Sequence, residues 1–190
     1  MKINVELSTK SVKETIKAIK KQRAILTDQA IPEFMLRSAE WISAEANKIV
    51  NLSDIGAEIK YNITSSWHIK VISKTRIVLY NMSWKAAYVE FGVGIVGEAS
   101  PHPNASQTDY EYNVDSPYKY SNGGWDFKVN NPMELDIPQD AIIEEYHGYE
   151  GITIYTRGTK GVWYLFNAME NFKLTERQRL WQEIKEKYWS

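Results

Sequence analysis

The stretch that most constrains the fold of this chain runs from Trp84 to Pro103 and reads WKAAYVEFGVGIVGEASPHP. Its first half has the composition of a short helix, and the spacing of Trp84 and Tyr88 allows their rings to share one helical face. Glycines follow at 92, 94 and 97, and glycine often ends a helix because it accepts positive φ. The sequence predicts an aromatic helix with Trp84, Tyr88 and Phe91 in the core, then a glycine-rich loop.

The segments YVEFGVG and PHP resemble the signature of a family of small virion proteins of long-tailed phages. Members are described as minor capsid, neck, head–tail joining or tail-completion proteins. The resemblance extends in element order over about residues 10–172, with residues 130–150 poorly matched. It includes a Gly-Trp-aromatic strand and a closing helix with a central aromatic residue and alanine. The residues that carry it are Trp84, Tyr88, Glu90, Phe91, Gly92, Gly94, Pro101, His102, Pro103, Trp125, Phe166 and Ala168.

This resemblance implies a structural role and no enzyme activity. A protein of this kind forms a ring of identical copies at the head–tail junction of the virion, after assembly in the host cytoplasm. Its implied partners are further copies of itself, a head connector or adaptor protein, and a tail terminator or tail tube protein. DNA passes through the ring without sequence-specific contact. We therefore expect no catalytic residue, no cofactor, no metal and no membrane partner.

The composition fits these expectations. The chain has 190 residues, which suits a single domain with an elaborated loop and hairpin region at about residues 92–151. It contains no run of about 18 apolar residues, so we expect no membrane span. The N-terminus lacks the apolar core of a signal peptide. Cysteine is absent, which excludes disulfides and thiolate zinc sites.

The net charge of −1 hides an uneven distribution along the chain. Residues 1–23 hold seven Lys or Arg against two Glu, and residues 90–150 hold two Lys against twelve Asp or Glu. Because phosphate contacts need Lys and Arg, the acidic middle argues against nucleic-acid binding there. This segment either lines the channel and repels DNA, or meets a basic surface such as the lysine-rich first helix of the next copy.

Tyrosines interleaved with the acids favour the second placement, because aromatic residues are enriched at protein interfaces. The predicted partner-interface residues are Asp109, Tyr110, Glu111, Tyr112, Asp115, Tyr118 and Tyr120.

Hydrophobic periodicity predicts an α+β fold, with an antiparallel sheet of about four to six strands and helices mainly on one face. A long loop insertion interrupts this arrangement. One helical pattern begins near Ser11, and a second runs from about Asp28 or Pro32 to Leu52. Helical patterns recur at Trp84–Phe91 and in the last 30 residues. The strand patterns are residues 59–63, 67–71, 77–80, 125–129 and 152–155.

Two alternatives from other functional classes stay open at this point. Exposed Tyr and Trp within residues 110–127 suggest a carbohydrate-binding module. Carboxylates such as Asp136 and Asp140 suggest a hydrolase, since glycoside hydrolysis uses two such groups. His147 follows two glutamates, Glu144 and Glu145, but no helical or strand register directs all three side chains to one point.

Overall fold

The computed structural model of the chain describes residues 9–112, 125–129 and 152–189. The chain divides into two compact units, each of which is assembled from segments distant in sequence. Unit 1 comprises Met1–Ile42, Ile69–Leu79 and Asn171–Ser190. Unit 2 comprises Ser43–His68 and Tyr80–Glu170.

The N-terminal helices follow one another without a break. They are α1 (Thr9–Ile25), a π-helical turn η1 (Leu26–Ala30) and α2 (Ile31–Leu52). In the π turn, the backbone N–H of Ile31 donates to the carbonyl of Leu26, five residues earlier. Pro32 follows directly and lacks the N–H that an α-helix would use, so a wider turn here accommodates its ring. Both predicted N-terminal helices are confirmed.

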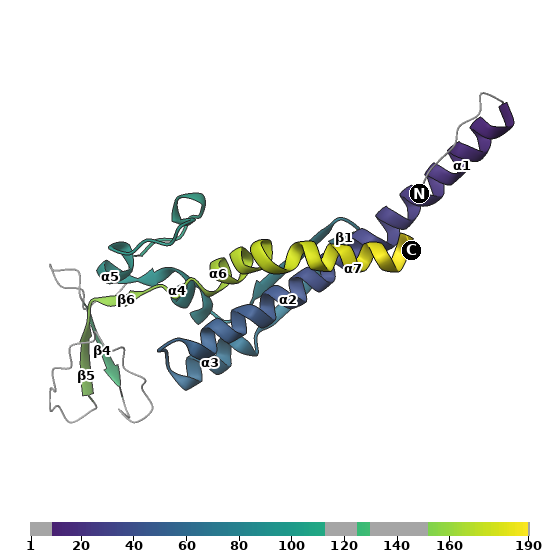
Figure 1. Ribbon diagram of the computed structural model, residues 1–190. Helices are drawn as coiled ribbons and strands as arrows, with labels where there is room; N and C mark the ends of the chain where they lie inside the picture. The colour runs from purple at the N-terminus through teal and green to yellow at the C-terminus, as the bar shows by residue number, and fades with distance from the viewer. Residues whose placement is uncertain (1–8, 113–124, 130–151, 190) are drawn as a thin grey trace. The chain divides into compact units, whose positions relative to one another are not determined.

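Unit 1 is built on a seam between the first half of α2 and the C-terminal helix α7 (Arg177–Trp189), which lie side by side in Figure 1. A second π turn, η4 (Phe172–Glu176), leads into α7. The ring of Phe34 meets that of Trp181 edge to face, with centroids 5.4 Å apart. The buried residues of the seam are Ala30, Phe172, Leu180 and Ile184.

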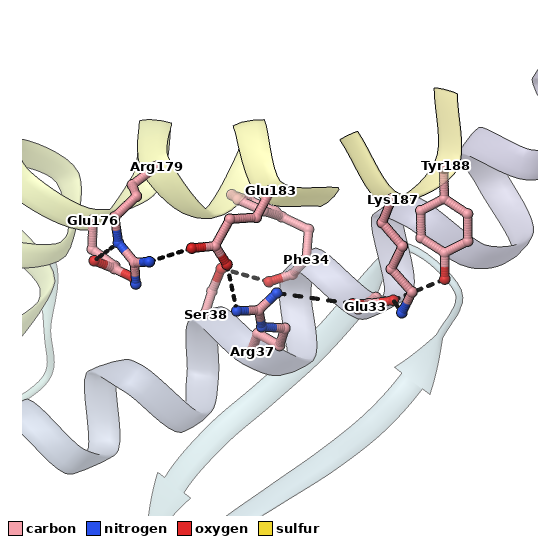
Figure 2. A network of polar contacts seen from close by, with 9 residues as sticks. All are labelled: Glu33, Phe34, Arg37, Ser38, Glu176, Arg179, Glu183, Lys187 and Tyr188. Atoms are coloured by element: carbon pink, nitrogen blue, oxygen red, sulfur yellow. Dashed lines mark hydrogen bonds and ion pairs between the residues drawn. The ribbon is translucent and has the colours of Figure 1, made fainter. Parts of the chain in front are cut away.

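Ion pairs line the edge of this seam (Figure 2). Arg37 contacts Glu183 at 2.8 Å, and Lys187 contacts Glu33 at 2.6 Å. Arg179 pairs with both Glu176 and Glu183 on its own helical stretch. Partly exposed ion pairs each contribute about 1 kcal/mol at most, so the apolar seam supplies most of the stabilisation.

A hairpin formed by β1 (Trp67–Ser73) and β2 (Arg76–Asn81) follows the helices. A two-residue turn joins the strands, a length that antiparallel pairing allows. In unit 1, Lys74 at the tip of the hairpin contacts Asp28 at 2.9 Å. The predicted strands at 67–71 and 77–80 are confirmed.

Unit 2 contains short elements around the glycine-rich stretch. Their order is α3 (Ala57–Thr64), α4 (Lys85–Phe91), β3 (Gly92–Val93), α5 (Gly94–Glu98), the 3₁₀ turn η2 (Ala105–Gln107), β4 (Trp125–Val129), β5 (Ile152–Thr156), β6 (Gly158–Lys160) and α6 (Tyr164–Asn171). Strand β3 pairs antiparallel with β6, and β4 pairs antiparallel with β5. The predicted strands at 125–129 and 152–155 and the predicted closing helix are confirmed.

The prediction of one antiparallel sheet with four to six strands is wrong. The described residues are mostly helical, and their strands form three separate two-stranded sheets. Residues 59–63 belong to helix α3 and not to a strand. Ile59 and Ile63 lie four residues apart, a spacing that fits one face of a helix as well as one face of a strand. Ile63 is buried and Tyr61 is 71% exposed, as the helical arrangement requires.

Candidate interaction surface

Helix α4 buries the face opposite to the one that its aromatic residues suggest. Trp84, which precedes its first turn, is 72% exposed and Tyr88 is 42% exposed, so the prediction that both are core residues is wrong. The buried residues of the helix are Ala86 and Glu90, which also lie four positions apart. Spacing shows which side chains share a face, but the contacts made by Glu90 decide which face is inside.

The carboxylate of Glu90 caps helix α6 from inside unit 2. Its Oε2 accepts the backbone N–H of Leu165 at 2.8 Å, and its Oε1 accepts that of Phe166 at 2.9 Å. The first N–H groups of a helix have no partner within the helix, and the helix dipole favours a negative charge there. Glu90 therefore satisfies two donors that would otherwise be unpaired.

His102 joins the same carboxylate. Its Nε2 lies 2.9 Å from Oε1 of Glu90, and its Nδ1 accepts the backbone N–H of Asn104 at 3.0 Å. Because Nδ1 accepts a hydrogen bond, a neutral ring carries its proton on Nε2 and donates it to Glu90. Glu90 and His102 are each only 5% exposed. The YVEFGVG and PHP segments thus meet at a buried glutamate–histidine pair.

Glycines allow the two strands beside this pair to approach each other closely. Gly92 and Gly158 have φ values of 84° and 103°, a region that favours glycine. A Cβ on Gly158 would overlap the carbonyl of Val93, and one on Gly161 would overlap the carbonyl of Glu90. Residues 157–161, RGTKG, have the composition of a turn but contain strand β6. The glycines three residues apart in RGTKG are the signal that this segment packs against the glycines of YVEFGVG.

Two of the predicted interface tyrosines hold the chain after the PHP segment. The hydroxyl of Tyr110 donates to the carbonyl of Gly92, and its ring stacks on Phe91 with centroids 4.5 Å apart. The hydroxyl of Tyr112 accepts the backbone N–H of His102 at 2.9 Å. Burial, followed by the neighbouring Tyr88 and Tyr112, raises the pKa of Tyr110 to about 12. These side chains are engaged within the unit.

The residues that alternate with them face solvent. Asp109 and Glu111 are exposed, and the ring of Tyr110 between them stacks on Phe91 at the end of α4, with centroids 4.5 Å apart. The rings of Trp84 and Tyr88 meet edge to face with centroids 5.9 Å apart. Together Trp84, Tyr88, Asp109 and Glu111 form what we call the aromatic–acidic surface.

Several predicted residues lie outside the part that the structure describes. They are Asp115, Tyr118, Tyr120, Asp136, Asp140, Glu144, Glu145 and His147. Trp125 opens strand β4, and Phe166 and Ala168 lie on α6, where Ala168 is fully buried. Pro101 and Pro103 flank His102 and are exposed.

Two other kinds of site are absent from the described residues. Within them, no group of three or more His, Cys, Asp or Glu is arranged to hold a metal ion. No helix in these ranges combines the length and apolar character needed to cross a membrane.

Comparison with protein families, with curated proteins and with solved structures finds no match to this chain. Its function is therefore inferred from its own motifs and contacts.

Proposed function

We propose that this chain is a structural virion protein at the head–tail junction of a long-tailed phage. Copies form a ring that joins the head connector to the tail. The starting point is the resemblance of YVEFGVG and PHP to neck and tail-completion proteins. The observation that supports it most is that the two segments meet at the buried Glu90–His102 pair.

The buried Glu90–His102 pair holds the segments around it in fixed positions. The carboxylate of Glu90 makes its hydrogen bonds to His102 and to the first turn of α6, so the pair supports the fold of unit 2 from inside.

The solvent-facing side of α4 suits a protein that acts by binding. Trp and Tyr dominate the energetics of protein interfaces because they bury a large area with few rotatable bonds. Trp84 and Tyr88 present such area, and Asp109 and Glu111 are exposed on either side of Tyr110, whose ring stacks on Phe91 of α4. The carbohydrate-binding alternative is weaker, since Tyr110 and Tyr112 make internal contacts. The partners proposed here are the connector or adaptor on one side and the tail terminator or tail tube on the other.

The proposal is tested in the phage or prophage that encodes the chain. Immunogold labelling of purified particles should mark the junction between head and tail. Deletion of the gene should give filled heads and complete tails that do not join, and a copy supplied in trans should restore joining. Label on another part of the particle, or a chain absent from purified particles, would contradict the proposal. A copy carrying Glu98→Gln, a change at an exposed position of α5, should restore joining as well as the wild type does.

A further inference from the structure

We propose that α1 of one copy docks on the aromatic–acidic surface of a second copy of this chain. This inference rests on the proposed function and deepens it, because it names the contact between neighbours in the ring. A ring needs a heterologous interface, in which two different patches on each copy complement each other. Two such patches are exposed on this chain.

The first patch is one face of α1. Val12, Ile16 and Ile19 recur at intervals of four and three residues, so they form a single apolar stripe. Their exposed fractions are 42%, 47% and 52%. Such a stripe on an amphipathic helix normally packs against another element.

Lysines flank this stripe. Lys13, Lys17, Lys20 and Lys21 are all exposed. Among the residues that the structure describes, none of these lysines is ion-paired. The face of α1 is therefore both apolar and basic.

The second patch has the opposite character. The exposed rings of Trp84 and Tyr88 offer apolar area for the branched side chains of α1. Nζ of Lys85 lies 5.6 Å from the centroid of the Trp84 ring and is ion-paired with Glu58. Asp109 and Glu111 stand next to Tyr110, which the carbonyl of Gly92 holds in place. Neither acid is paired with a cation in the described ranges. Lysine ammonium groups are attracted to carboxylates and to the faces of aromatic rings alike.

The charge along the chain favours the same pairing. The net charge of the chain is −1, and residues 1–23 carry about +5. The rest of the chain therefore carries about −6. Opposite charges on two surfaces guide their encounter and suppress contacts between like surfaces. Contacts between two α1 helices are disfavoured for that reason, and contact of α1 with the acidic surface of another copy is favoured.

Charge reversal tests the contact. One variant combines Lys13→Glu, Lys17→Glu and Lys20→Glu, and the other combines Asp109→Lys with Glu111→Lys. In sedimentation velocity, each should weaken self-association of the full chain about tenfold or more, since several exposed pairs are reversed together. A chain that carries both sets should recover association, because the attraction returns with its signs exchanged. Lys70→Glu with Lys185→Glu changes two exposed lysines elsewhere and should leave association unchanged.

Cross-linking identifies which chains are in contact. The chain has no cysteine, so engineered thiols react without background. A chain with Ile16→Cys mixed with a chain with Trp84→Cys should give a disulfide-linked pair on oxidation. A chain with both substitutions should give a ladder of linked copies. An intrachain disulfide would show that α1 occupies the surface of its own copy, and a link between two Ile16→Cys chains would show a symmetric contact. Either result overturns the inference.

The remaining outcomes separate this inference from the proposed function. If the chain is monomeric at every concentration and salt tested, or if both reversed chains associate like the wild type, the inference is wrong. The location of the chain in the particle is measured independently. If the chain is found at the junction but its charge-reversed forms still assemble, the proposed function stands and the proposed contact is wrong. If the chain associates through α1 but is absent from the particles, the proposed contact stands and the proposed function is wrong.

Discussion

Glu90 and His102 share a 2.9 Å hydrogen bond in the interior of unit 2, and the same carboxylate receives the first backbone N–H groups of α6, 75 and 76 positions further along the chain. Three segments therefore depend on one side chain. A buried carboxylate is stable only when hydrogen bonds replace the water that it loses. This arrangement makes Glu90 the residue whose substitution is most informative.

Glu90→Gln should lower the free energy of unfolding by about 2–3 kcal/mol. An amide has one acceptor oxygen, and its NH₂ group would face a donor where the carboxylate oxygen now accepts. Urea unfolding followed by circular dichroism measures the change. Glu98→Gln, at an exposed position, should stay within about 0.5 kcal/mol of the wild type. Equal stability of the Glu90→Gln chain and the wild type would contradict the hydrogen-bonding role.

Gly158→Ala should destabilise unit 2 by more than about 1 kcal/mol and lower the yield of folded protein. Its φ of 103° is unfavourable for alanine, and the new methyl group would overlap the carbonyl of Val93. Thermal unfolding compares it with Lys160→Ala, a change at an exposed position of the same strand. A Gly158→Ala chain that melts at the wild-type temperature would show that β3 and β6 do not approach as closely as described.

Trp84→Ala should change the free energy of unfolding by no more than about 0.5 kcal/mol, because the side chain is largely exposed. Tyr164→Ala should cost about 3–5 kcal/mol, because this aromatic ring is 2% exposed. The Tyr164 hydroxyl donates to the carbonyl of Ala86, and burial raises its pKa. Thermal melting of the two variants side by side measures the contrast. A larger loss for Trp84→Ala would return this residue to the core.

Glu33→Gln should destabilise unit 1 at neutral pH, with a difference from the wild type that shrinks in acid. The hydrogen bond from Lys187 lowers the pKa of Glu33 below its ordinary value of 4.5. A carboxyl group with a lowered folded pKa stabilises the protein fully above its unfolded pKa, and this contribution is lost as the pH falls through the folded pKa. Melting temperatures measured from neutral pH down to about pH 3 should therefore converge.

Lys187→Met removes the partner and should give the same convergence, because its Nζ lies 2.6 Å from Glu33. If the difference in melting temperature from the wild type stayed constant between neutral pH and about pH 3, the ionised Glu33–Lys187 pair would be excluded as its cause.

Local patterns were sufficient for most of the helices. The stripe of α2 includes Ala39 and Ala46, both buried, and that of α7 includes Leu180 and Ile184. Periodicity identifies such elements because the residues that share a helical face are near one another in sequence. The β1–β2 hairpin was predictable for the same reason, since alternating strands flank a short turn.

The sequence by itself determined which side chains share a face; only the tertiary structure decided which faces are buried. The spacing of Ile59 and Ile63 fits one face of a strand and one face of a helix, and packing of the buried Ile63 selects helix α3. At α4, the sequence favours Trp84 and Tyr88 as core residues, yet Glu90 is buried and Trp84 is exposed. The donors that make a buried carboxylate favourable come from His102, Leu165 and Phe166. Periodicity within α4 carries no information about these partners, because they reach Glu90 only when distant segments of the chain fold together.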